Sequence, residues 1–203
     1  MVNQDDPRVL RTRQLIREAF SDLLQKKGFD AITVKDIAQK ASINRATFYA
    51  HYEDKYALLE EITEQAFHKM YPEEVMNANE FTDEICNKLI ILTYNYIVTF
   101  YKTCGWNSKS IGTIVDEKIK KMLQETIGNI FLKGKTFRME DNINTKIISA
   151  MTCSDIYGAA YSWFKDGKND QTDLLLNIVR PYIMNGLNIY RNIDINNYEK
   201  GEN

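Results

Sequence analysis

The chain has 203 residues, of which 44% are hydrophobic and 27% are charged, and its formal net charge is −2. These values are typical of a soluble globular protein with one large domain or two small ones. No apolar run approaches the roughly 20 residues of a membrane span, and the first residues lack an apolar signal region. We therefore expect a cytoplasmic protein with no membrane-spanning segment.

Cysteine and histidine are too few and too scattered to indicate a metal site. Cys86, Cys104 and Cys153 are an odd number at wide spacing, which is typical of reduced thiols in a hydrophobic core. A disulfide and a metal site are the weaker alternatives for these thiols. We predict no cofactor and no metal.

Helical spacing dominates the chain. Proline (three residues) and glycine (nine) are scarce, and apolar residues recur at helical intervals almost throughout. No alternating strand pattern and no internal repeat is present. The sequence predicts an all-α fold.

The first predicted helix has a readable beginning and end. Asp6 precedes Pro7, a pair that is typical of an N-cap and the first helical position. Gly28 follows two lysines, and we expect it to end the helix in a left-handed conformation. The apolar face between them consists of Ile16, Ala19, Phe20, Leu23 and Leu24.

Three further helix starts follow in quick succession. Thr33 and Asp36 form a capping-box pattern at the start of a short second helix, which runs to about Ala41. Asn44 suits the N-cap of a third helix through about Ala50, and Asp54 that of a fourth beginning at Lys55. Only the residues ASIN separate the second and third helices, which predicts a helix-turn-helix.

The third predicted helix has two unlike faces. Phe48 and Tyr52 share one face and, with Ile43, are predicted to pack on the first two helices. The remaining side chains carry guanidinium, hydroxyl, phenol and imidazole groups that suit phosphate oxygens and base edges; they are Arg45, Thr47, Tyr49 and His51.

The segment AITVKDIAQKASINRATFYAHYEDKYALL resembles the DNA-binding segment of the TetR/AcrR family of bacterial transcriptional regulators. The resemblance depends on an ordered set of positions: Gly28, Phe29, Thr33, Ile37, Ala38, Ala41, Thr47, Tyr49, His51, Lys55, Leu58 and Leu59. It covers about the first quarter of the chain. In the turn, Ser42 stands where the family usually has glycine, so we expect backbone strain or an adjusted turn there.

The resemblance implies roles for individual residues in binding double-stranded DNA. Lys35 and Arg45 would read bases, and Ala46 would touch a thymine methyl group. The residues implied to hold phosphates are Thr33, Thr47, Tyr49, His51 and Lys55. Alternatives remain for three of these residues: Tyr49 half-buried against the first helix, His51 bracing the third helix, and Lys35 as an ordinary solvated charge.

Overall charge by itself gives little attraction to DNA, because residues 1–60 carry nearly equal numbers of basic and acidic side chains. The N-terminal arginines are clustered on or before the first helix: Arg8, Arg11, Arg13 and Arg17. They either contact phosphates or form a solvated face.

Residues 1–53 are predicted to form the helix-turn-helix DNA-binding domain, and residues 54–203 a helical domain for effector binding and dimerisation. In the second domain we expect the fourth helix to end at Pro72, an irregular link through Phe81, and polar loops at 133–142 and 166–171. The later helices are predicted at about 82–103, 114–132, 143–165 and 172–190. Pro181 lies inside the last one and is expected to kink it.

The resemblance implies a homodimer formed by the last two helices, in a four-helix bundle, and a small-molecule effector of unknown identity bound among the helices of the second domain. Aromatic side chains that would suit such a pocket are Tyr96, Phe100, Trp106, Phe131, Tyr157 and Tyr161. The same rings are equally compatible with ordinary core packing.

The function these patterns indicate is a sequence-specific transcriptional regulator, a ligand-responsive repressor that acts as a homodimer on a palindromic operator. Repression is the commoner behaviour in the family, and activation remains an alternative. An enzyme is disfavoured because only two histidines are present and no phosphate loop or nucleophile motif is found. A helical ligand- or partner-binding module without DNA recognition is the other alternative.

Overall fold

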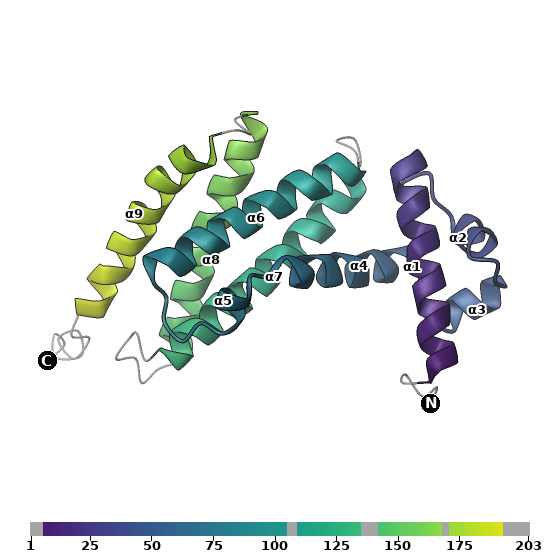
Figure 1. Ribbon diagram of the computed structural model, residues 1–203, viewed down its shortest axis with the longest axis horizontal. Coiled ribbons are helices and arrows are strands. Elements are labelled where there is room, and N and C mark those ends of the chain that lie inside the picture. The colour runs from purple at the N-terminus through teal and green to yellow at the C-terminus, as the bar shows by residue number, and fades with distance from the viewer. Residues whose placement is uncertain (1–5, 105–108, 135–141, 168–170, 193–203) are drawn as a thin grey trace, which may run out of the picture. The chain divides into compact units, whose positions relative to one another are not determined.

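The computed structural model describes residues 6–104, 109–134, 142–167 and 171–192, and all regular structure in them is helical. This confirms the predicted all-α class. The helices in these residues are α1 (Pro7–Lys27), α2 (Val34–Lys40), α3 (Arg45–Tyr49), α4 (Lys55–Met70), α5 (Glu73–Met76), α6 (Asp83–Cys104), α7 (Lys109–Lys133), α8 (Asn142–Lys165) and α9 (Thr172–Asn192) (Figure 1).

Helix α1 begins and ends at the predicted residues. The Asp6 carboxylate accepts a hydrogen bond from the Arg8 amide, and Pro7 occupies the first turn, where its missing N–H costs no hydrogen bond. At the other end the Gly28 amide donates to the Leu24 carbonyl. Gly28 has a φ of 70°, as expected, but its ψ of 162° lies outside the left-handed helical region. The chain therefore leaves α1 in a more extended direction than a standard helix stop would give.

Helix α2 begins with a complete capping box. The Thr33 hydroxyl accepts a hydrogen bond from the Asp36 amide, and the Asp36 carboxylate accepts one from the Thr33 amide at 2.8 Å. Lys27, at the end of α1, forms an ion pair with the same carboxylate at 2.9 Å. The beginning of α2 is thus tied to the end of α1.

The turn between α2 and α3 is a Schellman motif built around Ser42. The Ser42 amide donates to the Gln39 carbonyl, and the Ile43 amide donates to the Ala38 carbonyl at 2.9 Å. Ser42 has a φ of 56° and is the one non-glycine residue with positive φ among those described. Of the two expectations for this position, backbone strain is therefore the one observed, because the turn keeps the left-handed geometry that glycine adopts at lower cost.

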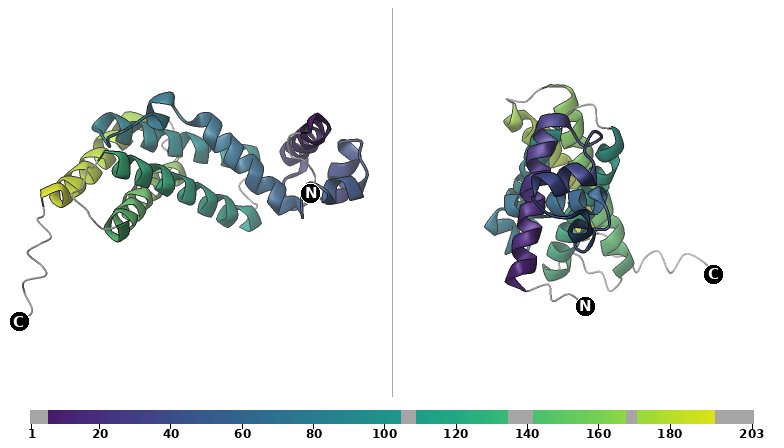
Figure 2. Two further views of the ribbon diagram at one scale, coloured as in Figure 1. Left: turned by 90° about the horizontal axis from the view of Figure 1, so that it is seen from below. Right: turned by 90° about the vertical axis from the view of Figure 1, so that its right-hand side faces the viewer.

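The helix-turn-helix has a small core of its own. Helix α1 contacts α2, and α2 contacts α3, so that the three helices gather into one cluster (Figures 1 and 2). The fully buried side chains in this cluster include Ile16, Phe20, Phe29, Ile37 and Phe48. These come from the apolar faces predicted from helical spacing, together with the loop residue Phe29.

The chain forms two compact units. One contains residues 1–70 and 98–119, and the other contains residues 71–97 and 120–203. The first unit thus includes α1–α4 together with the end of α6 and the beginning of α7. Helices α6 and α7 each continue from one unit into the other.

The structure corrects the predicted elements after α4 in two places. The segment expected to be an irregular link contains the short helix α5, whose Val75 is 1% exposed. Helix α7 begins at Lys109, five residues before the predicted start at 114. Seven of the ten residues predicted as a loop at 133–142 lie outside the described residues, as do three of the six predicted as a loop at 166–171.

Helices α8 and α9 contact each other and share a core. Their apolar residues divide between buried and exposed faces. Ile156, Tyr157, Leu175, Ile183 and Leu187 are buried. An exposed set, which we call the α8–α9 stripe, consists of Ile147, Met151, Leu174, Ile178, Tyr182 and Ile189, each at least 46% exposed. Pro181 lies within α9, as predicted.

Cys86 and Cys153 are buried free thiols, as predicted. The side chain of Cys104 lies outside the described residues. Burial raises the pKa of Cys86 to about 12 and that of Cys153 to about 11, so both are protonated. Within the described part of the chain, no helix is both long enough and apolar enough to cross a membrane.

Candidate nucleic-acid interface

Helix α3 presents one apolar side chain inward and its polar side chains outward. The Asn44 side chain caps the helix by accepting from the Ala46 amide at 3.0 Å. Phe48 is fully buried, and its ring meets the Tyr49 ring edge to face at 5.6 Å. Arg45 and Ala46 are exposed and Tyr49 is 52% exposed. The helix is therefore held by Phe48, while its first turn is open to a partner.

Thr33, the N-cap of α2, and Lys35, in its first turn, were both predicted to contact DNA, and they differ in their present hydrogen bonds. Lys35 is exposed. The Thr33 hydroxyl donates to the Asp36 carboxylate at 2.6 Å and accepts from the Asp36 amide, so it is engaged in capping. Hydrogen bonds from the Thr33 hydroxyl, from Lys27 and from the Thr33 amide hold the pKa of the Asp36 carboxyl well below its usual range.

Thr47, within α3, and His51, two residues after its end, are half-buried. Burial lowers the pKa of His51, and the nearby charge of Arg13 lowers it further. The imidazole is therefore neutral at pH 7 and offers one N–H donor rather than two.

Lys55 points back into its own unit. Its ammonium donates to the Phe29 carbonyl at 3.1 Å and the Ile32 carbonyl at 2.8 Å. The same nitrogen lies 4.3 Å from the centre of the Phe29 ring, a cation–π distance. Two of its three N–H donors thus hold the loop between α1 and α2, and one remains for another acceptor.

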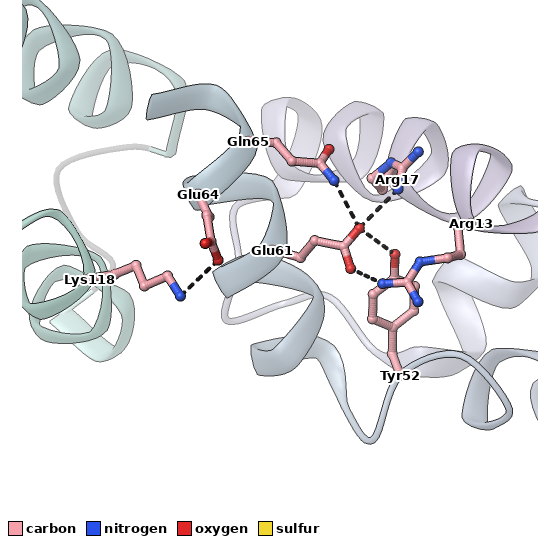
Figure 3. A network of polar contacts seen from close by, with 7 residues as sticks. All are labelled: Arg13, Arg17, Tyr52, Glu61, Glu64, Gln65 and Lys118. Carbon is pink, nitrogen blue, oxygen red and sulfur yellow. Dashed lines mark hydrogen bonds and ion pairs between the residues drawn. The ribbon is translucent and has the colours of Figure 1, made fainter. Parts of the chain in front are cut away.

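A cluster of polar contacts, which we call the Glu61 network, joins α1, α4 and the segment after α3. Its members are Glu61, Arg13, Arg17, Tyr52 and Gln65 (Figure 3). Oxygen Oε1 of Glu61 accepts from Arg17 at 2.9 Å, from the Tyr52 hydroxyl at 3.1 Å and from Gln65 at 3.1 Å. Oxygen Oε2 accepts from Arg13. This carboxylate thus accepts four hydrogen bonds, three at Oε1 and one at Oε2.

The protonation states in the Glu61 network agree with these contacts. Burial acts to raise the pKa of the Glu61 carboxyl, but hydrogen bonds from Arg17 and Arg13 outweigh it and leave that pKa below its ordinary value. Burial raises the pKa of the Tyr52 phenol, and the Glu61 charge raises it further. The network therefore contains a carboxylate, two guanidinium ions and a neutral phenol at pH 7.

Sequence reasoning left the role of the N-terminal arginines open and missed Glu61. Arg8 and Arg11 are exposed and available to a phosphate backbone. Arg13 and Arg17 instead form ion pairs with Glu61. Their spacing of four residues places them on one helix face, a signal for a shared acidic partner. Which carboxylate supplies it depends on how α4 packs, and this cannot be read from spacing.

Helix α4 carries a further ion pair one turn after Glu61. Glu64 pairs with Lys118 of α7 at 2.9 Å between Oε2 and Nζ (Figure 3). Both residues belong to the first compact unit. The first part of α7 is thereby attached to the helix that carries Glu61.

Five of the six predicted pocket aromatics lie among the described residues. Tyr96, Phe100, Phe131 and Tyr157 are at most 9% exposed, Tyr161 is half-buried, and Trp106 is outside the described residues. A groove of about 640 Å³ between α7 and α8 is lined by other residues, most of them of polar type: Lys121, Gln124, Glu125, Gly128, Asn129, Leu132, Thr145, Lys146 and Ser149. None of the predicted aromatics lines this groove.

The sequence similarity to known proteins lies mainly in the region of the helix-turn-helix. Residues 16–62 match the family described as bacterial regulatory proteins, tetR family. An HTH-type transcriptional regulator of Bacillus subtilis, YxbF, is 44% identical over 64 residues, which are 31% of this chain and 17% of that protein. The dhaKLM operon transcriptional activator DhaS of Lactococcus lactis is 36% identical over 81 residues, which are 40% of this chain and 41% of that protein. The chain thus spans less than half the length of these curated relatives.

A likeness of fold extends over most of the chain. The solved structure of RolR, in complex with resorcinol, superposes with a TM-score of 0.54 over 84% of this chain and 88% of that one, at 17% identity. At this identity the likeness concerns the fold alone. Residues 16–62 therefore match, in motif and in sequence, the helix-turn-helix segment of the tetR family of bacterial regulatory proteins.

Proposed function

We propose that the protein is a ligand-responsive repressor that binds a palindromic operator as a homodimer. The observation that carries the proposal is the exposed first turn of α3, with Arg45 and Ala46 outward while Phe48 anchors the helix from behind. A short helix held in this way can enter a major groove without disturbing its own core.

Each exposed residue of this surface has a distinct proposed task. Arg45 would bind the O6 and N7 atoms of a guanine, and Lys35 would reach a neighbouring base. Ala46 would lie against a thymine methyl group. Phosphates would be held by Thr33, Thr47, Tyr49, His51 and Lys55. For Lys55 the contact would use its one remaining donor, because the other two hold the Phe29 and Ile32 carbonyls.

The α8–α9 stripe supports the homodimer. Leu174, Ile178, Tyr182 and Ile189 recur at helical spacing along α9 and remain exposed in the single chain. On α8 three exposed positions that follow Met151 at helical spacing are small, namely Ser154, Gly158 and Ser162, so another helix could approach closely there. A second copy placed by a twofold axis would bury both stripes in a four-helix arrangement. Two copies of α3 would then face half-sites about 34 Å apart or somewhat more.

The effector is proposed to be a small molecule of apolar or planar chemistry, bound among the helices of residues 54–203. The aromatic content of this region supports that class, and the fold neighbour RolR is described in complex with resorcinol. Effector binding would weaken operator binding by a coupling free energy of about 1–3 kcal/mol. Because the relative DhaS is named an activator, activation is the alternative outcome of the same experiment.

The proposal is tested by titrating DNA from either side of the coding region with the purified protein, in a gel shift at fixed salt. We expect one fragment to bind far more tightly than a scrambled fragment of equal length. Arg45→Ala should weaken the tight complex by about 1–3 kcal/mol. Lys133→Ala, which removes an exposed charge at the end of α7, is the matched control and should bind as wild type. Equal binding by wild type and Arg45→Ala would reject the assignment of α3.

A reporter gene placed behind the bound fragment separates repression from activation. Deletion of the regulator should raise reporter expression if the protein represses. A fall in expression would identify an activator, and the DNA-binding part of the proposal would stand.

A further inference from the structure

The Glu61 network lies directly behind the helix proposed to enter the major groove. Tyr52 follows α3 by three residues, and its amide donates to the Phe48 carbonyl at 2.9 Å. The Phe48 and Tyr52 rings are also neighbours, with centroids 5.8 Å apart. Whatever fixes Tyr52 therefore also fixes the inner anchor of α3.

Tyr52 is held at its hydroxyl and at its ring face. The hydroxyl donates to Glu61, and the Arg13 guanidinium lies 4.9 Å from the ring centroid. Arg13 is itself hydrogen-bonded to Glu61. Glu61, Arg13 and Tyr52 thus form a closed triangle of contacts among α4, α1 and the end of the helix-turn-helix.

We propose that Glu61 is a positioning residue for DNA recognition: it sets the orientation of α3 through Tyr52 and Arg13 without touching DNA itself. This inference rests on the proposed function, because it concerns how the same surface is aligned with bases. Glu61 belongs to α4, the helix that follows the α2–turn–α3 unit, and the exposed fraction of its side chain is 21%.

The number and origin of its hydrogen bonds are the reason that Glu61 can act in this way. The four donors come from three parts of the fold, namely α1, α4 and the segment after α3, so the carboxylate ties these parts together. Glutamine in its place would keep the size but lose the charge and half of the acceptor capacity. Arg13 would then be free to leave Tyr52, and α3 could tilt on its Phe48 anchor.

Base recognition is more sensitive to such a tilt than phosphate binding. A bidentate contact needs the guanidinium and the base edge to be coplanar, whereas a phosphate accepts donors from many directions. Loss of Glu61 should therefore reduce discrimination between operator and other DNA more than it reduces binding in general.

The experiment compares wild type with Glu61→Gln, Tyr52→Phe and the double variant. The probes are the tightly bound flanking fragment and a scrambled fragment of equal length, measured by fluorescence anisotropy over a range of salt concentrations. Glu60→Gln, an exposed neighbour on the same helix, is the matched control. Thermal unfolding followed by circular dichroism establishes that every variant is folded at the temperature of the titration.

We expect Glu61→Gln to lower the ratio of operator to scrambled affinity by about tenfold, within the range that one well-aligned base contact supplies. Tyr52→Phe, which removes only the hydroxyl, should lower the ratio in the same direction by a smaller factor. The double variant should lose less than the product of the two factors, because both changes break the same triangle. The salt dependence of operator binding should stay unchanged, since the phosphate contacts are the same.

Two results would overturn the inference. One is a discrimination ratio equal to that of wild type in folded Glu61→Gln and Tyr52→Phe. The other is tighter binding of both fragments by Glu61→Gln with a steeper salt dependence, which would mean that Glu61 only neutralises Arg13 and Arg17. If wild type itself fails to distinguish the two fragments, the proposed function fails, and the inference fails with it.

Discussion

The ammonium group of Lys55 and the loop residue Phe29 are in contact at two points. Nitrogen Nζ donates to the Phe29 carbonyl at 3.1 Å and lies 4.3 Å from the centre of the Phe29 ring. The first residue of α4 is thereby joined to the loop after α1. A lysine at a helix start, which sequence reasoning assigned to phosphate binding, therefore also has a role in holding the fold.

Replacement of Lys55 by methionine should destabilise the protein. The aliphatic stem is kept, but two charge-assisted hydrogen bonds and the cation–π contact are lost. The Phe29 carbonyl keeps the hydrogen bond from the Ile32 amide, whereas the Ile32 carbonyl loses the one from Lys55. We expect a decrease of about 1.5–3 kcal/mol in the free energy of unfolding, measured with urea. Lys35→Met, at an exposed position, is the control and should change stability by less than about 0.5 kcal/mol. Equal stabilities for the two variants would show that the Lys55 contacts contribute nothing.

Glycine at position 42 should stabilise the protein. Ser42 adopts a φ of 56°, where a side chain costs about 1–2 kcal/mol, while the greater freedom of glycine in the unfolded chain costs about 0.5–1 kcal/mol. The net gain expected for Ser42→Gly is about 0.5–1 kcal/mol in urea unfolding. Ser42→Ala keeps a side chain in the same backbone conformation and should be close to neutral. A loss of stability in Ser42→Gly would indicate that the serine makes a compensating interaction in solution.

Stability should fall in acid, in part through Glu61. The pKa of this carboxyl is lower in the folded protein than in the unfolded chain, so its contribution is complete above the unfolded value of about 4.3. That contribution is lost as the pH falls through the lower folded-state pKa, because the unfolded chain then binds the proton more readily. Urea unfolding between pH 7 and pH 3 should therefore show a shallower decline in Glu61→Gln than in wild type. Parallel declines for the two proteins would contradict the lowered pKa.

A charge on the α8–α9 stripe should separate the proposed dimer. Ile178 and Tyr182 are 56% and 68% exposed in the single chain, and a twofold partner would bury them. Ile178→Glu or Tyr182→Glu would place a carboxylate in that apolar contact, at a cost that a dimer of this kind does not sustain. Sedimentation equilibrium should give twice the chain mass for wild type and a single chain mass for either variant.

Asn177→Asp introduces a charge at an exposed position to one side of the stripe and is the control for this experiment. It should keep the wild-type mass. A monomeric wild type would show that the proposed dimer does not form. A dimer that persists in both glutamate variants would show that the dimer contact lies outside the α8–α9 stripe.

Local signals in the sequence determined most of the helix-turn-helix. Asp6, Thr33, Asn44 and Asp54 were each predicted as N-caps, and each accepts amide hydrogen bonds in the structure. Such signals depend on residues within one turn of each other, so they can be read without knowledge of the fold. The short helix α5 and the early start of α7 were missed because weak patterns in short or polar segments leave the boundary to packing.

What only the tertiary structure decided is which charged groups meet. Arg13 and Glu61 are separated by 48 residues, and Lys55 and Phe29 by 26. Contacts over such separations do not produce a helical spacing pattern that the sequence could reveal. Their pairing depends on the angle at which α4 packs against α1, and that angle is set by the buried faces of both helices. The sequence alone therefore determined where helices begin and which faces are apolar, because these follow from local backbone and side-chain chemistry. The tertiary structure decided which arginines remain available to DNA, because that depends on the acidic groups folded against them.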